Sequence, residues 1–142
     1  MKIGITQRVD LVADYEETRD SLDQRWIELI EFLGAKALPI PNKIKDINLW
    51  LDEMKCDGFI FTGGNDLSNL NTSKNISPER DKTEFTLLQY AIDQSIPLLG
   101  VCRGFQIMNV FFGGKLKKIS GHVAKPHTIK FCFDKNDNWA SR

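Results

Sequence analysis

Short apolar runs and amphipathic stretches alternate along this chain, and that alternation limits the possible folds more than any other feature. Apolar runs typical of buried strands lie at residues 2–6, 35–40, 58–62 and 97–101. Stretches with apolar residues at three- and four-residue spacing, typical of helices, lie at 21–33, 47–54, 82–94 and 104–112. Strands that alternate with helices are joined by right-handed crossovers. The pattern therefore predicts an α/β fold with a mostly parallel central sheet and helices on both faces.

The stretch between the third strand and the third helix is polar. Residues 65–81 read NDLSNLNTSKNISPERD and are rich in Asn, Ser and Pro, so we expect a loop without regular structure. Glycines at 63 and 64 end the strand before it, and the next strand ends near Cys102. Ligands of parallel α/β sheets bind beyond the carboxyl ends of the strands. These two strand ends are therefore the predicted site.

The length and the net charge of the chain limit the kinds of molecule that we expect it to bind. The chain has 142 residues, of which 42% are hydrophobic, enough for one ordinary core, so we expect residues 1–142 to form a single domain. Nineteen basic and nineteen acidic side chains cancel, which gives no electrostatic reason to expect nucleic acid or a membrane surface as a partner. No apolar run approaches the ~20 residues of a membrane helix. We expect a cytoplasmic protein that acts on a small molecule.

Three cysteines, at positions 56, 102 and 132, are spread along the chain without a C-x-x-C pair. An odd number at wide spacing disfavours both a disulfide framework and a zinc site, so free thiols and no metal are expected. A free cysteine is usually a small buried hydrophobe, and we accept that interpretation for Cys56 and Cys132. Cys102 differs because glycines stand two residues away on each side.

The G-x-C-x-G run from Gly100 to Gly104 lies between a predicted strand and a predicted helix. This arrangement is typical of a nucleophile elbow, in which small flanking residues let the backbone turn tightly and hold the side chain out above the sheet. A thiol at a helix N-terminus also faces unpaired N–H groups, which favours the reactive thiolate. The N–H of Arg103 is a candidate oxyanion donor, and the backbone of Gly64 is the natural second one.

The run GVCRGFQIMNVFFGG at 100–114 resembles the signature of class I glutamine amidotransferases, and specifically of their γ-glutamyl hydrolase branch, peptidase family C26. GGNDLS at 63–68 and ERDKTEF at 79–85 resemble the loop after the third strand and the R-D-x-x-E helix start of that family. With GITQR at 4–8 and HVAKPH at 122–127, the resemblance extends over residues 3–131. It is strongest to the small γ-glutamyl-CDP-amidate hydrolases of capsule phosphoramidate biosynthesis.

The resemblance implies a flavodoxin-like three-layer sandwich and cleavage of a γ-glutamyl amide, releasing glutamate, by a Cys-His-Glu triad without cofactor or metal. Cys102 is then the nucleophile, Gly64 and Arg103 supply the oxyanion amides, and Gln106 helps to line the glutamyl pocket. Gly63 and Asn65 belong to the same substrate-binding loop. Taken as residues alone, Gln106 could equally be solvated, and the Arg103 side chain could pair elsewhere instead of assisting the thiol.

Two further expectations concern charged and titratable side chains. Arg80, Asp81 and Glu84 could order the loop through Arg-carboxylate pairing, but helix-start carboxylates that favour the macrodipole are the interpretation we prefer. In the family, the triad base and acid lie in a later H-x-E motif, and no H-x-E exists here. His122 and His127 precede the family position of the base, and we expect structural roles for both. The chain is therefore expected to lack the C-terminal part of the fold.

Other functions remain open at this point. The chain could be a glutaminase that feeds ammonia to a synthetase partner as one component of a larger enzyme, or a non-catalytic fragment or pseudoenzyme that binds γ-glutamyl compounds. A homo-oligomer is also possible. A third class, thiol proteins that share the sheet and the cysteine position but act on other substrates, is disfavoured by the residues at 63–67 and 100–106.

Overall fold

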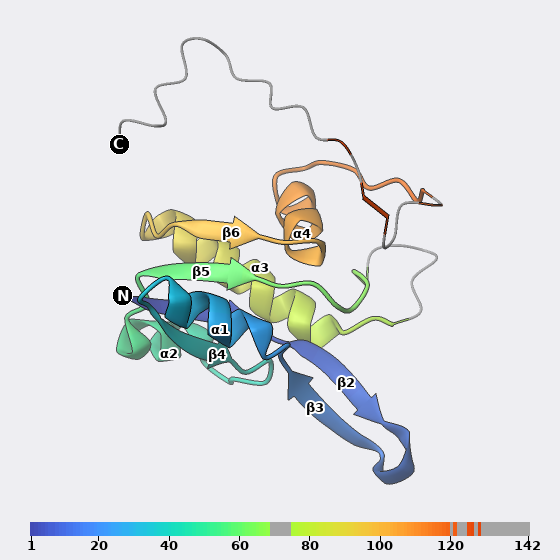
Figure 1. Cartoon of the computed structure of the whole chain (residues 1–142), viewed down its shortest axis with the longest axis horizontal. Helices are drawn as coiled ribbons and strands as arrows, with labels where there is room; N and C mark the ends of the chain where they lie inside the picture. The colour runs from blue at the N-terminus through green and yellow to red at the C-terminus, as the bar shows by residue number, and fades with distance from the viewer. Residues whose placement is uncertain (69–74, 120, 122–124, 127, 129–142) are drawn as a thin grey trace.

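The computed structural model describes residues 1–68, 75–119, 121, 125–126 and 128. Four parallel strands form its central sheet, in the order β4-β1-β5-β6. They are β1 (Lys2–Thr6), β4 (Lys36–Ile40), β5 (Gly58–Phe61) and β6 (Leu98–Gly100). The helices are α1 (Arg25–Phe32), α2 (Ile47–Met54), α3 (Pro78–Asp93) and α4 (Arg103–Phe111). The predicted α/β class and parallel sheet are confirmed (Figure 1).

Hydrophobic side chains are buried on both faces of this sheet because successive residues of a strand point in opposite directions. In β5, Phe59 and Phe61 join one core cluster, whereas Ile60 joins the other. The first cluster also takes buried side chains from three helices, namely Leu51, Leu87, Leu88, Ala91 and Ile107. The second includes Ile5 of β1 and Ile30 of α1. Helices therefore cover both faces, α1 on one and α2, α3 and α4 on the other.

An antiparallel hairpin follows β1, and the sequence analysis did not predict it. It consists of β2 (Arg8–Val12) and β3 (Glu17–Ser21), connected through a short 3₁₀ helix at Ala13–Tyr15. Figure 1 shows the hairpin projecting away from the central sheet. The prediction of a helix from residue 21 was wrong at its start, because Ser21 pairs with Arg8 across the hairpin and α1 begins only at Arg25.

The third helix begins earlier than expected. We predicted a loop up to residue 81, but α3 starts at Pro78, with Ser77 as its N-cap and proline in its first turn. The Ser77 hydroxyl accepts a hydrogen bond from the backbone N–H of Arg80 at 3.3 Å. Serine at the N-cap and proline just inside a helix are common start signals, which the polar composition of the segment obscured. An isolated bridge joins Asp66 to Ile76 in the same segment.

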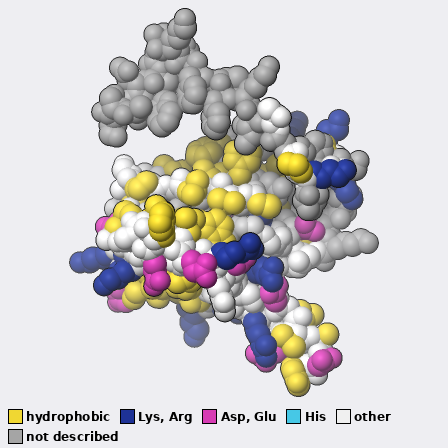
Figure 2. Space-filling model, in the orientation of Figure 1, with side chains coloured by type: hydrophobic (Ala, Val, Ile, Leu, Met, Phe, Trp, Pro, Cys, Tyr) yellow, Lys and Arg dark blue, Asp and Glu magenta, His cyan; other side chains and the backbone are white. Residues whose placement is uncertain are grey.

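Among the described strands, β6 lies at one edge of the sheet, and the surface beside it is apolar. Leu99 of β6 is 53% exposed. A groove of about 280 Å³ runs along the α1 face between α1 and β6, lined mainly by apolar residues of both elements and of β1 and β5. Figure 2 shows hydrophobic side chains gathered on this face. No helix in the described part of the chain is both long enough and apolar enough to cross a membrane.

Candidate active site

The ends of β5 and β6 lie side by side, as the sequence predicted. Phe61 of β5 pairs with Gly100 of β6, and its carbonyl oxygen accepts a hydrogen bond from the N–H of Val101 at 2.9 Å. Beyond these residues, the chain at Gly63 meets Cys102. A methyl group built on Gly63 would lie 3.4 Å from Cβ and 3.6 Å from Sγ of Cys102. The glycine loop and the cysteine turn therefore form one site.

Cys102 occupies a strained turn between β6 and α4. It is the N-cap of α4 and has φ 56° and ψ −108°, a conformation that residues with a side chain rarely adopt. Such backbone strain costs on the order of 1–3 kcal/mol and persists only where surrounding packing enforces it. The residue is exposed and its thiol is free. A free thiol is thus held at the surface, at the N-terminus of a helix.

Glycines on both sides of Cys102 allow the close packing that enforces this turn. A Cβ on Gly100 would overlap the Met108 sulfur and lie 2.8 Å from the backbone of Gly104. A Cβ on Gly104 would overlap the carbonyl oxygen of Phe61, because the first turn of α4 rests directly on β5. The helix start can approach the strand only because Gly104 has no side chain.

Replacing Gly104 by alanine is therefore expected to destabilise the protein by about 3 kcal/mol or more, since the new methyl group meets backbone that cannot move aside as a side chain can. Urea denaturation followed by circular dichroism measures the change. Gly34→Ala is the matched control: Gly34 has φ 71° and open space around it, so only the left-handed conformation is penalised, at about 1–2 kcal/mol. Equal losses in the two variants would contradict the close contact of α4 with β5.

Two backbone N–H groups beside Cys102 are available to a ligand. Within the described ranges, no hydrogen-bond acceptor is found for the N–H of Gly64 or for that of Arg103. Gly64 has φ 124°, and a Cβ there would lie 2.7 Å from Cβ of Arg8 and 2.9 Å from Nη1 of Arg80. Only glycine fits this position. The two residues that the sequence analysis named as oxyanion donors thus keep their amides free.

A buried network of charged side chains supports the glycine loop from beneath. Arg80 and Glu84 of α3 are both 0% exposed. Nε of Arg80 donates to Oε1 of Glu84 at 2.9 Å, and its terminal nitrogens donate to the carbonyl oxygens of Thr62 and Gly63, each at 3.0 Å. Burial lowers the pKa of the Arg80 guanidinium from its ordinary value, and the nearby Arg103 adds to this effect while Glu84 opposes it. One buried side chain therefore fixes two successive carbonyl groups of the loop.

The same network reaches the residue after the cysteine. The Arg103 guanidinium is almost fully buried and donates to the carboxylates of Glu84 and Asp81. Asp81 also accepts a hydrogen bond from the backbone N–H of Ser68 at 2.9 Å. Our preferred interpretation, in which the acidic residues of this helix start serve mainly the macrodipole, was therefore wrong: Arg-carboxylate pairing orders the loop. The Arg103 side chain pairs with these carboxylates.

The remaining predicted substrate-binding residues lie on opposite sides of this site. Asn65 is buried, and its side-chain amide is bound to both backbone groups of Val9, with Oδ1 accepting from the N–H at 2.8 Å and Nδ2 donating to the carbonyl at 2.7 Å. In this position Asn65 ties the hairpin to the glycine loop. Gln106 is half-buried, one turn into α4, and its backbone N–H donates to the carbonyl of Cys102 at 3.1 Å.

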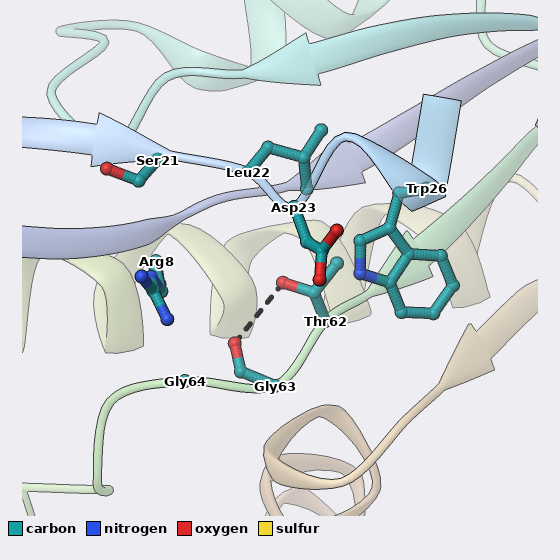
Figure 3. A pocket seen from close by; sticks show the side chains of 8 residues that line it. All are labelled: Arg8, Ser21, Leu22, Asp23, Trp26, Thr62, Gly63 and Gly64. Atoms are coloured by element: carbon teal, nitrogen blue, oxygen red, sulfur yellow. Dashed lines mark hydrogen bonds between the residues drawn. The ribbon is translucent and has the colours of Figure 1, made fainter. Parts of the chain in front are cut away.

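A cavity of about 340 Å³ opens next to the glycine loop. It is lined by Arg8, Ser21, Leu22, Asp23, Trp26, Thr62, Gly63 and Gly64. Figure 3 shows Arg8 on one side of the cavity, near Gly64, and Asp23 with Trp26 on the other. The Arg25 guanidinium lowers the pKa of the Asp23 carboxyl to about 2, so this group is ionised at neutral pH. The sequence analysis missed the cavity because it missed the hairpin that supplies Arg8 and Ser21.

Of the remaining cysteines and the histidines, only Cys56 lies among the described residues. Cys56 is buried in the first core cluster, and burial raises the pKa of its thiol, so it lacks the exposure and ionisation expected of a nucleophile. Its predicted structural role agrees with this position. Cys132, His122 and His127 lie outside the described residues.

Comparisons with known proteins show the family to which the chain belongs. The sequence model of the family described as Peptidase C26 matches residues 2–138, and the chain belongs to that family. It is 33% identical over 138 residues to a gamma-glutamyl-CDP-amidate hydrolase of Campylobacter jejuni, covering 95% of this chain and 66% of that protein. The family resemblance in the sequence is thus confirmed.

Other similar proteins have names that refer to glutamine amidotransferases or to glutamine hydrolysis. A putative glutamine amidotransferase-like protein of Lactococcus lactis is 34% identical over 104 residues, covering 66% of this chain and 42% of that protein. One of the subunits of a glutamine-hydrolysing GMP synthase of Pyrococcus furiosus is 31% identical over 112 residues, covering 76% of this chain and 50% of that protein. The chain therefore spans between about two fifths and two thirds of the length of these three relatives.

Proposed function

We propose that this protein hydrolyses a γ-glutamyl amide with Cys102 as the nucleophile. The observation that carries the proposal is an exposed thiol, held in a strained turn at a helix N-terminus, next to the free amides of Gly64 and Arg103. The similarity of the chain to a gamma-glutamyl-CDP-amidate hydrolase supports the same reaction class. We further propose a γ-glutamyl-linked nucleotide phosphoramidate as the substrate and capsule biosynthesis as the setting. An exposed free thiol is suited to the reducing cytoplasm.

The reaction has two steps. The Cys102 thiolate attacks the side-chain carbonyl carbon of the glutamyl group, and the N–H groups of Gly64 and Arg103 stabilise the negative charge that develops on the carbonyl oxygen. A carbon–sulfur bond forms, the carbon–nitrogen bond breaks, and the amine leaves with a proton. Water then attacks the thioester, which releases glutamate and restores the thiol. The proton carriers for these steps are not assigned to any described residue.

The glutamyl group is proposed to lie against α4 and the glycine loop. Gly63 lies beside Cys102 and has no side chain to fill the space between them, and Gln106 is one helical turn from the nucleophile. Asn65 contributes by holding the loop against the hairpin. No step of this mechanism calls for a metal ion or an organic cofactor.

Product analysis tests the proposal. We expect incubation of the protein with a γ-glutamyl-linked nucleotide phosphoramidate to release glutamate and the free nucleotide phosphoramidate in equal amounts. We expect its kcat/KM to be at least about tenfold above that for L-glutamine, since the larger leaving group adds binding contacts. The control is the same protein after alkylation by iodoacetamide. Glutamate release that survives alkylation, or no release from either compound, would contradict a cysteine hydrolase.

A glutaminase that supplies ammonia to a synthetase partner is a second candidate, favoured by the similarity to subunits of two glutamine-hydrolysing GMP synthases. It differs in substrate preference: L-glutamine would then be the better substrate, and ammonia release would rise when the partner is added. A protein that only binds γ-glutamyl compounds would release no product in either assay.

A further inference from the structure

The cavity beside the glycine loop, which we call the hairpin cavity, lies on the opposite side of that loop from α4. The sheet order places β5 between β1 and β6. The chain leaves β1 into the hairpin, and it leaves β6 into Cys102 and α4, so the residues after β5 separate the hairpin from the nucleophile turn (Figure 1). Gly63 lines the cavity and also lies beside Cys102, since a Cβ on Gly63 would be 3.6 Å from Sγ of Cys102. A molecule whose carbonyl group lies over the thiol thus has α4 on one side and the hairpin cavity on the other.

The hairpin cavity offers three different kinds of contact. Arg8 bears a positive charge; its Nε donates to Asp10, while its two terminal nitrogens have no partner among the described residues. Trp26 presents an indole ring, and Asp23 presents an ionised carboxylate beside it (Figure 3). The volume of about 340 Å³ falls within the range of pockets that hold drug-sized ligands. These contacts suit a ligand with an anionic group, a planar ring and hydrogen-bond donors.

We propose that the hairpin cavity binds the leaving group of the substrate and that this leaving group is a nucleotide, with its phosphate on Arg8 and its base on Trp26. The proposal rests on the hydrolase function above, because that reaction fixes the carbonyl group over Cys102. Arginine binds phosphate oxygens through charge-assisted hydrogen bonds, and nucleobases stack on indole rings. The Asp23 carboxylate then accepts a hydrogen bond from an exocyclic amino group or a ribose hydroxyl.

The glutamyl end of the substrate is the competing occupant. Its carboxylate and ammonium groups match the charges of Arg8 and Asp23, but an amino acid has no planar ring to place on Trp26. It is also smaller than the ligands that pockets of this volume usually hold. The two occupants make opposite predictions about which compound loses affinity when Arg8 is changed.

Isothermal titration of the protein with cytidine diphosphate, and separately with L-glutamate, distinguishes them. Arg8→Gln removes the guanidinium but keeps the stem up to Cδ that packs against Gly64. We expect it to weaken cytidine diphosphate binding by about tenfold or more, and Trp26→Leu to weaken it by roughly five- to a hundredfold. The matched control is Arg19→Gln on the same hairpin, whose exposed side chain pairs with Glu17 outside the cavity. It is expected to leave binding unchanged.

Several outcomes would contradict the proposal that the hairpin cavity binds a nucleotide. Cytidine diphosphate could fail to bind, could bind Arg8→Gln as tightly as the parent protein, or could bind the parent while Arg8→Gln weakens L-glutamate instead. Thermal melting of each variant shows whether it is folded. If Trp26→Leu is unfolded, the result for Arg8→Gln alone decides the test. Labelling of Cys102 by 6-diazo-5-oxonorleucine, a γ-glutamyl electrophile, is measured on the same samples. Normal labelling without nucleotide binding contradicts the cavity alone, whereas absent labelling contradicts the hydrolase function.

Discussion

Replacing Cys102 by serine is expected to abolish covalent labelling of the protein by 6-diazo-5-oxonorleucine. A serine hydroxyl is not ionised at neutral pH and is a far weaker nucleophile than a thiolate. Loss of the nucleophile in enzymes of this kind lowers the rate by on the order of 10⁴-fold or more. The substitution adds no atoms to the tight turn, so the fold should be unchanged. Mass spectrometry of the intact protein and of its peptides measures the labelling.

Cys56→Ser is the matched control for this experiment. Cys56 is buried, and burial raises the pKa of its thiol, so it is not expected to react at an appreciable rate. The Cys56→Ser protein should be labelled at Cys102 at the parent rate. Labelling that persists in Cys102→Ser, or that maps to Cys56 in the parent protein, would remove Cys102 from its proposed role.

The cysteine turn could be predicted because its determinants are local in sequence. Gly100, Cys102 and Gly104 lie within five consecutive residues, and a Cβ on Gly100 would meet Gly104 and Met108, which are also near in sequence. The same holds for the central strands, whose apolar runs directly reflect burial on both faces of a parallel sheet. Adjacency of the two strand ends then followed from the general topology of such sheets.

The hairpin could not be predicted because its strands carry no clear periodicity. All residues of β3 except Ser21 are exposed, so no apolar face marks it as a strand. The hairpin is attached instead through polar contacts, such as those of Asn65 with Val9, between residues 56 positions apart. A single sequence gives no sign of such a pairing. The hairpin cavity was missed for the same reason.

The buried charged residues show that contacts between residues far apart in the sequence can determine what a side chain does. Arg80, Asp81 and Glu84 have the composition of an exposed helix start, and nothing in the local sequence distinguishes them from one. Arg80 is buried against Thr62, 18 residues earlier, and Glu84 is buried against Arg103, 19 residues later. Arg80 and Arg103 share Glu84, and Arg80 also binds the glycine loop. The network therefore connects the two halves of the proposed oxyanion site.

Glu84→Ala is expected to destabilise the protein by about 3–5 kcal/mol, because it leaves two buried guanidinium groups without their shared carboxylate. Asp81 would still pair with Arg103, but Arg80 would retain only carbonyl, amide and hydroxyl oxygens as acceptors. The positive charge of Arg80 would then repel that of Arg103 in a medium of low dielectric constant. Urea denaturation followed by circular dichroism measures the loss of stability.

Asp93→Asn, near the C-terminal end of the same helix, is the control for Glu84→Ala. Asp93 is exposed and accepts a hydrogen bond from Gln89, so its neutralisation should change the free energy of unfolding by no more than about 0.5 kcal/mol. Glu84→Gln should fall between the two, since its amide oxygen accepts from one guanidinium while its NH₂ group faces the other. A Glu84→Ala loss as small as that of Asp93→Asn would mean that the buried carboxylate does not hold the two arginines. The glycine loop and the cysteine turn would then have to be positioned by packing alone.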